Sequence, residues 1–261
     1  MSVQQVAEAW SRLGENYAVS APHKFGASLP KLIALARPTA DDVCLDIGTG
    51  TGHTAAQLAR TAKKVYGLDP SEGMRRAAQG TYGHWGNLEL IPGTSENTGF
   101  PNDTFDIVTA RHTLQHHPSM PRTLQEIKRV LKPGGRLVIV DEITPNVEVD
   151  AWVHELEVTR DPTHGRAYFL DEWKGFIRKA GLEWIAGDTE TVYRLEVEPW
   201  ITRMKPTPEQ AEKVRHLFRD AGMTVQDTFN IIYTDGDAVT FDMPMALIFA
   251  IKPESKPERK S

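Results

Sequence analysis

Cysteine is nearly absent from the chain: Cys44 is the single cysteine among 261 residues. One cysteine cannot form an intramolecular disulfide, and no Cys/His spacing typical of zinc ligands occurs. We therefore predict neither a disulfide-stabilised scaffold nor a metal site, and a reducing compartment suits this composition best. Long apolar runs are absent too, because no stretch approaches the roughly 18 apolar residues of a membrane span and the N-terminal residues contain no signal-peptide core. These absences predict a cytoplasmic protein without a membrane span.

The chain also has no excess of basic residues. Its 30 Lys and Arg residues face 35 Asp and Glu residues, for a net charge of −5, and several basic residues gather only at positions 252–261. Nucleic-acid binding depends on a concentrated positive patch that neutralises phosphates, so we expect no nucleic-acid partner. Residues 252–261 contain two prolines and no apolar residue, which predicts a disordered tail.

From residue 43 onward the chain alternates short β-branched runs with helical patterns. The runs predict buried strands, and the segments between them predict helices with one apolar face. Strands are predicted at 43–47, 65–68, 88–91, 105–110 and 136–140, and helices at 53–62, 71–80 and 119–131. Strand alternating with helix predicts the α/β class with a doubly wound parallel sheet.

Two flanking regions follow other patterns. Residues 1–40 have apolar residues at helical spacing and predict an N-terminal helical cap. The main domain is predicted at 41–251, with its core at 41–145 and a helical, substrate-side insertion at 146–240. The outer elements are predicted as helices at 147–159, 171–180 and 208–221 and as strands at 182–186 and 245–251, the last strand having the sequence MALIFAI.

A glycine-rich loop, DIGTGTGH at residues 46–53, follows the first predicted strand directly and precedes a helix. Glycines at such a place allow a sharp turn and bring bare backbone against a ligand. The spacing lacks the third glycine of a dinucleotide fingerprint and the Gly-Lys-Ser/Thr ending of a phosphate loop. The negative charge of Asp46 would repel a pyrophosphate and attract a cationic group. The loop therefore favours a cationic nucleoside ligand, with a plain strand-to-helix turn as the alternative.

Asp69 ends the second predicted strand, VYGLD. An acidic side chain at that place can accept hydrogen bonds from both hydroxyls of a ribose, whereas a phosphorylated ribose would be repelled. The alternative is that Asp69 caps the helix that begins near Ser71. The glycine loop and the terminal acid together predict a nucleoside site more strongly than either does alone.

Four segments of the chain together resemble a known family. LDIGTGTGHT, VYGLDPS, IPGTSENTGFPNDTFDIVTARHTLQHH and LKPGGRLVIVD occur in this order over residues 40–142. They resemble the class I S-adenosylmethionine-dependent methyltransferases, especially the small-molecule group related to the ubiquinone and menaquinone C-methyltransferases. The stretch RDPTHGRAYFLDEW extends the resemblance to about residue 185. The resemblance implies a Rossmann-like sheet of seven strands whose last strand is antiparallel.

The resemblance also implies which residues bind S-adenosylmethionine. Asp46 would lie near its amino-acid moiety, Asp69 on the ribose hydroxyls and Met74 near the adenine. Arg111 matches a position that often faces the methionine end, with an exposed arginine at a strand end as the alternative. The implied set is Asp46, Gly48, Thr49, Gly50, Gly52, Asp69, Met74, Thr94, Ser95 and Arg111.

The segment after the third predicted strand departs from the family. Related proteins often have an acidic residue after the glycine there, which contacts the adenine amino group, whereas Thr94 and Ser95 follow Gly93 in this chain. A hydroxyl accepts such a hydrogen bond more weakly than a carboxylate does. We therefore expect a modest affinity for S-adenosylmethionine.

Two histidines are candidate catalytic bases. Methyl transfer needs alignment, exclusion of water and, for some acceptors, removal of a proton. His116, in HTLQHH, lies where related proteins commonly have a histidine, and a neutral imidazole can accept a proton at neutral pH. His164, in RDPTH, is the second candidate. The alternative is that both histidines pack against or cap nearby turns.

The substrate side is expected to involve residues 160–173 and several aromatic side chains. Asp161, His164 and Tyr168 resemble positions that line the substrate side in related enzymes. An aromatic wall for a planar acceptor is one interpretation of a wider set, and a place in the core is the other. That set is Trp152, Phe169, Trp173, Tyr193 and Trp200.

The sequence thus predicts an enzyme that transfers a methyl group from S-adenosylmethionine to a carbon, oxygen or nitrogen atom of a small molecule. One alternative is a protein or nucleic-acid methyltransferase, which the low basicity and the lack of an Asn/Asp-Pro-Pro-Tyr/Phe motif disfavour. Another is a non-catalytic S-adenosylmethionine-binding protein that regulates a partner. Neither the acceptor nor the oligomeric state is predicted.

Overall fold

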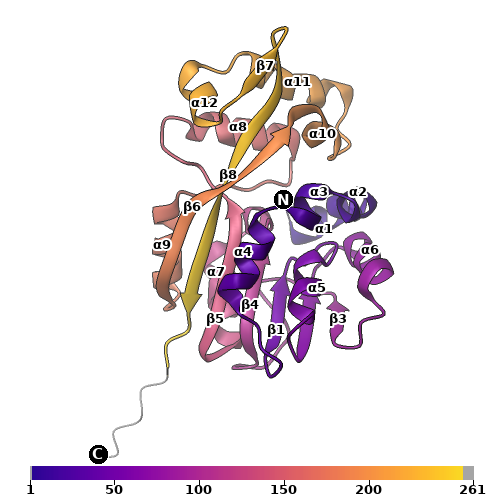
Figure 1. Ribbon diagram of the computed structural model, residues 1–261, viewed down its shortest axis with the longest axis vertical. Helices are drawn as coiled ribbons and strands as arrows, with labels where there is room; N and C mark the ends of the chain where they lie inside the picture. The colour runs from indigo at the N-terminus through magenta and orange to yellow at the C-terminus, as the bar shows by residue number, and fades with distance from the viewer. Residues whose placement is uncertain (1, 255–261) are drawn as a thin grey trace, which may run out of the picture.

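The computed structural model describes residues 2–254. Its centre is an eight-stranded sheet with the order β3-β2-β1-β4-β5-β8-β6, in which β7 pairs with β8 (Figure 1). Neighbours among β1 to β5 are parallel, and β8 is antiparallel to both β5 and β6. The predicted α/β fold with an antiparallel last strand is therefore confirmed, and β7 is an additional strand that the sequence did not predict. The strands are Val43–Ile47 (β1), Lys64–Leu68 (β2), Leu88–Ile91 (β3), Phe105–Arg111 (β4), Leu131–Glu142 (β5), Glu183–Glu196 (β6), Ile232–Thr234 (β7) and Asp237–Ile251 (β8).

Helices surround the sheet in the order that the alternation predicts. Within residues 2–254, no helix is long and apolar enough to cross a bilayer. The α-helices are Val3–Ser11 (α1), Gly14–Ala18 (α2), Ala21–Phe25 (α3), Ser28–Ala36 (α4), His53–Ala59 (α5), Glu72–Tyr82 (α6), Met120–Val130 (α7), Asp150–Arg160 (α8), Leu170–Lys179 (α9), Val197–Thr202 (α10), Pro208–Arg219 (α11) and Met223–Thr228 (α12), and Leu114–His116 forms a short 3₁₀ helix.

The two faces of the sheet carry separate sets of buried side chains, because successive residues of a strand point to opposite sides. Cys44 and Ile107 belong to the set that includes apolar residues of α4 and α5. Leu45 and Val108, one position further along the same strands, belong to the set that includes residues of α7 and α9. Helices therefore cover both faces, as a doubly wound sheet requires.

Strands β6 and β8 are much longer than the segments that the sequence predicts. Their outer halves leave the central sheet together as a two-stranded ribbon, and this ribbon carries a second lobe with β7, α8, α10, α11 and α12 (Figure 1). In β6 the buried residues Thr191, Tyr193 and Leu195 alternate with exposed ones, which is the pattern of a strand with one buried face. The predicted insertion at 146–240 thus contains a strand ribbon besides its helices.

The N-terminal helices divide into two groups. Leu32 and Ala36 of α4 are fully buried in the core on one face of the sheet, whereas α1 has no fully buried residue. Helices α1 to α3 lie over the end of the sheet, beside α6 (Figure 1). At the other terminus, Lys252 still donates hydrogen bonds to Asp103 (2.6 Å) and to the Leu131 carbonyl (2.7 Å). The predicted disordered tail therefore does not include Lys252, and its positions 255–261 lie outside the described residues.

We predict that the second lobe depends on Phe241 of β8. This side chain is fully buried, and its ring lies 5.0 Å from that of Trp200 on α10 and 5.1 Å from that of Phe218 on α11. Phe241→Ala leaves a cavity between these elements and should lower the free energy of unfolding by about 3–5 kcal/mol. Val239 on the same strand is 43% exposed, so Val239→Ala is the control. Urea denaturation measures both, and an equal effect of the two substitutions would contradict the packing described here.

Candidate active site

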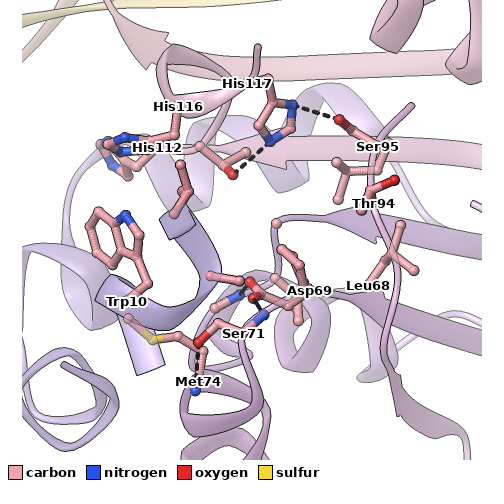
Figure 2. A pocket seen from close by; sticks show the side chains of 18 of the residues that line it. Trp10, Leu68, Asp69, Ser71, Met74, Thr94, Ser95, His112, His116 and His117 are labelled. Atoms are coloured by element: carbon pink, nitrogen blue, oxygen red, sulfur yellow. Dashed lines mark hydrogen bonds between the residues drawn. The ribbon is translucent and has the colours of Figure 1, made fainter. Parts of the chain in front are cut away.

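The glycine-rich loop after β1 lies beside the segment that follows β4. These neighbouring parallel strands flank the place where the strand order reverses, and ligands of open α/β sheets bind at the carboxyl ends of the strands there. A cavity of about 130 Å³ occupies this place. The ends of β1 to β4 and helix α1 line it, and Figure 2 shows Trp10, Asp69, Met74, Thr94 and His116 around it.

Two glycines of the loop have backbone conformations that side chains rarely adopt. Gly48 has φ +58° and Gly50 has φ +53°. A Cβ on Gly48 would lie 1.9 Å from Thr113 Oγ1, whereas a Cβ on Gly50 would meet only the Gly48 carbonyl oxygen, at 3.9 Å. Gly48 is therefore required for packing against the segment after β4. Gly50 presents bare backbone to the open cavity, as a loop that closely approaches a ligand does.

Asp46 lies behind the loop and does not line the cavity. Its two carboxylate oxygens accept hydrogen bonds from Thr49 Oγ1 (2.7 Å) and Thr109 Oγ1 (2.6 Å). Burial raises its pKa to about 6, against the effect of these two hydroxyls. The carboxylate thus holds Thr49 in place beside the cavity, and the implied contact of Asp46 with the amino-acid moiety stays a prediction. Gly52 is likewise outside the lining: it precedes α5 with φ +82° and faces Ala78 and Tyr82.

Asp69 connects the glycine loop to the segment after β2. Its carboxylate accepts hydrogen bonds from the backbone N–H of Gly50 and of Ser71, both at 2.8 Å. The cap of α6 is Ser71, whose Oγ accepts from the Met74 N–H, so Asp69 is not the N-cap of that helix. Each carboxylate oxygen has a second lone pair, which leaves acceptors for two further donors. Burial raises the pKa of Asp69 to about 6.

The predicted adenine side is formed by residues after β2 and β3. Met74 is almost fully buried and lines the cavity together with Thr94 and Ser95 (Figure 2). The Ser95 hydroxyl already interacts with His117 Nδ1 (2.8 Å) and Thr123 Oγ1 (3.0 Å). Thr94 makes no side-chain hydrogen bond to any described residue, so its hydroxyl is the one available to a ligand.

Arg111 brings a buried guanidinium to the wall of the cavity. Its Nε donates to Thr54 Oγ1 (2.9 Å) and one terminal nitrogen donates to the His23 carbonyl oxygen. The other terminal nitrogen, Nη1, is buried and has no partner among residues 2–254. A buried donor without an acceptor is costly. The guanidinium is therefore suited to a carboxylate, such as that of a methionine moiety.

A second cavity adjoins the first and shares part of its wall. Trp10, Tyr17, His23, His112 and His116 line both cavities. The second is smaller, about 50 Å³, and extends between the central sheet and the second lobe. Its lining includes the charged and polar residues Glu142, Glu157, Arg160, Asp161, His164 and Arg203, together with apolar side chains such as Leu195, Met243 and Met245.

His116 lies at the boundary between the two cavities, on the 3₁₀ helix after β4. Its Nδ1 lies 3.4 Å from the Thr163 carbonyl oxygen and 3.8 Å from Asp161 Oδ2, and the Trp10 ring packs edge-on against it. Burial lowers the pKa of His116, although the charge of Asp161 opposes this effect. The imidazole is therefore neutral near pH 7, which is the form that accepts a proton.

His164 does not meet the first cavity, so the two predicted catalytic histidines occupy different places. His164 lines only the second cavity, with its Nε2 3.9 Å from Glu142 Oε2. Burial and the neighbouring His116 lower its pKa to about 3. A neutral imidazole at 3.9 Å is not a salt bridge partner.

The five aromatic side chains divide between the two interpretations. Tyr193 and Trp200 line the second cavity, whereas Phe169 does not. Of the three positions expected on the substrate side, Asp161 and His164 line this cavity and Tyr168 does not. Trp152 packs against Phe218 and Phe229, and Trp173 is buried against Tyr168. These bulky side chains serve the core, where their large apolar area is most stabilising.

The sequence predicted a helical cap at residues 1–40 but did not single out Trp10, Tyr17 and His23 as site residues. Trp10 of α1 donates from Nε1 to Thr163 Oγ1 at 2.9 Å, which connects this helix to the loop after α8. Tyr17 and His23 pack edge-on beside it, with ring centroids 4.7 Å apart. The cluster of aromatic and histidine side chains within residues 10–23 was the available signal, since helices of a simple cap need no such residues.

Comparison with known proteins identifies the family. A family model described as a methyltransferase domain matches residues 45–139. The protein named uncharacterized methyltransferase YcgJ, from Bacillus subtilis (strain 168), is 32% identical over 233 residues, which are 87% of this chain and 91% of YcgJ. This chain belongs to the class I methyltransferases.

Two further similarities support this membership of the methyltransferase family. The crystal structure of YcgJ superposes with a TM-score of 0.81 at 30% identity, over 87% of this chain and 99% of YcgJ. The demethylmenaquinone methyltransferase of Symbiobacterium thermophilum is 31% identical over 240 residues, 86% of each chain. The family that the four sequence segments resemble, and the enzyme class that it implies, are confirmed: the protein is an S-adenosylmethionine-dependent methyltransferase.

We predict that the methyltransferase loses affinity for S-adenosylmethionine in acid. Above pH 6 the Asp69 carboxylate is ionised and accepts hydrogen bonds, and below its pKa of about 6 the neutral carboxyl is a poorer acceptor. The dissociation constant should rise by about tenfold per pH unit below 6, which calorimetric titration between pH 5 and 8 measures.

Asp69→Asn is the matched control for this profile. It removes the titration while keeping one carbonyl acceptor, so binding should be weaker and nearly independent of pH. Asp46 has a similar pKa and remains in that variant. A wild-type slope that persists unchanged in Asp69→Asn would assign the effect to Asp46 and contradict a ribose contact by Asp69.

Proposed function

We propose that this methyltransferase transfers the methyl group of S-adenosylmethionine to a small, polar acceptor held in the second cavity. The observation that carries the proposal is the shared wall: the two cavities meet at Trp10, His112 and His116. A methyl group can pass in line from donor to acceptor only where the two ligands touch. The shared wall is a place where donor and acceptor could touch, and Trp10 of α1 is part of it.

The first cavity suits S-adenosylmethionine along its length. Met74 and Thr94 would contact the adenine, and Asp69 would accept from the ribose hydroxyls. Gly50 leaves room for the ligand beside its bare backbone. The unpaired Nη1 of Arg111 would bind the methionine carboxylate. With the ribose at Asp69 and the carboxylate at Arg111, these residues would leave the sulfonium near the residues that line both cavities.

The second cavity supports a small polar acceptor rather than a large apolar one. Its volume is about 50 Å³, and charged side chains such as Glu157, Arg160 and Asp161 are buried around it. Burying apolar surface among charged groups removes their solvation without replacing it. Some curated relatives are named demethylmenaquinone methyltransferases, but a bulky quinone is poorly matched to this lining.

The chain's own residues would perform three tasks in the reaction. Bound S-adenosylmethionine supplies an electrophilic methyl carbon, whose bond to sulfur breaks as the bond to the acceptor atom forms, with the electron pair remaining on sulfur. Trp10, held by Thr163, excludes water from this step. His116 accepts the proton that the acceptor atom gives up, and Asp161 stabilises the charge that the imidazole gains.

A labelling experiment tests the proposed acceptor class. The enzyme is incubated with methyl-labelled S-adenosylmethionine and a cell extract, and the label is then separated into protein and nucleic-acid precipitate, organic layer and aqueous small molecules. We expect the label in the aqueous fraction, with Asp69→Asn as the low-binding control. Label confined to the precipitate or to the organic layer would refute a small polar acceptor.

We predict that His116→Gln lowers kcat by about 100-fold at neutral pH, because an amide cannot accept the proton. The affinity for S-adenosylmethionine should change much less, which calorimetry measures on the same protein. His216 on α11 is exposed, so His216→Gln should retain full activity. If kcat of His116→Gln falls by less than about tenfold, His116 is a positioning residue and not the base.

A further inference from the structure

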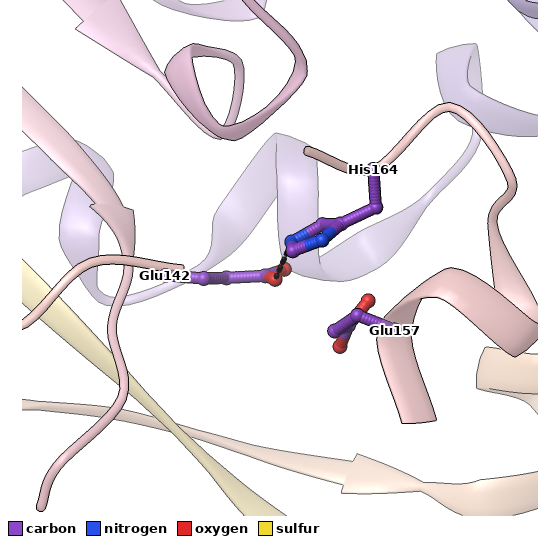
Figure 3. Close-up of side chains that lie close together, drawn as sticks. All are labelled: Glu142, Glu157 and His164. Carbon is purple, nitrogen blue, oxygen red and sulfur yellow. Dashed lines mark ion pairs between the residues drawn. The ribbon is translucent and has the colours of Figure 1, made fainter. Parts of the chain in front are cut away.

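Three side chains of the second cavity converge from separate parts of the chain. Glu142 ends β5, Glu157 lies on α8 and His164 lies on the loop that follows α8 (Figure 3). One ligand atom from each lies within 4.8 Å of the other two. Figure 3 shows the carboxylates and the imidazole directed toward a common centre.

These side chains have buried polar atoms without partners. Glu142 Oε2, Glu157 Oε1 and both ring nitrogens of His164 form no hydrogen bond with any described residue. Glu157 is only 2% exposed and His164 only 7%. Each unpaired buried polar group costs about 1–3 kcal/mol. Several such groups facing one centre indicate a ligand that satisfies all of them together.

The nearby cations do not fill this role. The Nε of Arg160 donates to the Trp200 carbonyl oxygen at 3.2 Å, and its guanidinium packs over the Trp200 ring. Its Nη1 lies 3.6 Å from Glu157 Oε2, too far for a hydrogen bond. The unpaired oxygen of Glu157 is the other one, Oε1. Arg203 also lines the cavity and packs beside Tyr17.

The chemical types of the three side chains also favour a bound cation. Carboxylate oxygens and an imidazole nitrogen lone pair are donors that divalent metals bind. His164 Nε2 faces Glu142 Oε2 across 3.9 Å with no hydrogen bond between them.

We propose that Glu142, Glu157 and His164 bind one divalent cation at the wall of the second cavity. Two carboxylates and one imidazole suit Mn²⁺, Fe²⁺ or Zn²⁺. The ligand atoms now lie within 4.8 Å of one another. Ligand distances of roughly 2.0–2.2 Å place donor atoms about 3–4 Å apart, so the side chains need to approach by about 1–2 Å. The sequence predicts no metal site because spacing rules for Cys and His ligands do not detect two glutamates and a histidine that the fold brings together.

The remaining coordination positions would face the acceptor. All three ligand residues line the second cavity, so an oxygen or nitrogen atom of the acceptor can bind the ion directly. An atom bound to a divalent cation loses its proton more readily, and His116 lies close enough to receive it, with its ring 5.9 Å from that of His164. This role rests on the proposed function, whereas the binding of the ion does not.

Titration of the metal-stripped protein with Mn²⁺, in the absence of S-adenosylmethionine, tests the site. Electron paramagnetic resonance counts free Mn²⁺, and we expect one tightly bound ion per chain. Glu157→Gln and His164→Gln should each weaken binding by at least the roughly 10–100-fold that loss of an outer-shell partner typically costs. The controls are Glu155→Gln, at an exposed position of α8, and His216→Gln, at an exposed position of α11. Both should bind Mn²⁺ as the wild type does.

Absence of saturable binding of both Mn²⁺ and Zn²⁺ to the wild type, or unchanged affinity in Glu157→Gln and His164→Gln, would overturn the proposal. Circular dichroism verifies the fold of each variant, and Glu142→Gln replaces any variant that fails to fold. Calorimetry with S-adenosylmethionine on the same samples separates the two proposals. Donor binding without metal binding refutes the metal site alone, and metal binding without donor binding refutes the assignment of the first cavity.

Discussion

The contacts of the Asp69 carboxylate with two backbone N–H groups are the interaction on which the rest of the site depends. One group belongs to Gly50 in the loop after β1 and the other to Ser71 at the start of α6. The carboxylate thereby sets how the glycine loop lies against the next strand, and with it the shape of the donor cavity. The arrangement has an energetic cost, since burial raises the pKa of the same carboxyl to about 6. New hydrogen bonds from a ligand would stabilise the ionised Asp69 carboxylate and offset this cost, as is typical of binding sites.

The sequence predicted best those site residues that come directly after a strand. The glycine loop and Asp69 come at the ends of β1 and β2, so one alternation pattern places both at the same edge of the sheet. Asp46 shows the limit of this reasoning. Its charge appeared available for a ligand, but Thr109, which occupies one of its oxygens, comes from a strand far along the chain. A sequence pattern places Asp46 on a strand, but it does not reveal that the Thr109 hydroxyl of a neighbouring strand donates a hydrogen bond to it.

The acceptor side was largely hidden for a related reason. Trp10, Glu142, Glu157 and His164 come from four segments, and each is unremarkable in its own context: Glu157, for example, lies in a helix with ordinary charged neighbours. Only the fold makes such residues meet. The strands β6 and β8 were likewise predicted too short, because in their outer halves buried residues alternate with exposed or partly buried ones and form no continuous apolar run. Apolar runs in the centre of the sheet are easier to recognise, since burial on both faces leaves few polar residues in them.

The ribbon of β6 and β8 has a mechanical consequence. Both strands continue from the central sheet into the second lobe, and their pairing has a register shift between Asp188 and Thr191. The ribbon therefore offers a bulge rather than a loop at which the lobe could bend. Helix α1 contrasts with it: no residue of this helix is fully buried, and its side-chain hydrogen bonds to the rest of the protein include that of Trp10 to Thr163 and that of Ser11 to Ser71. Lifting α1 would therefore break few buried contacts, and we expect ligands to enter and leave by movement of this helix while the second lobe stays in place.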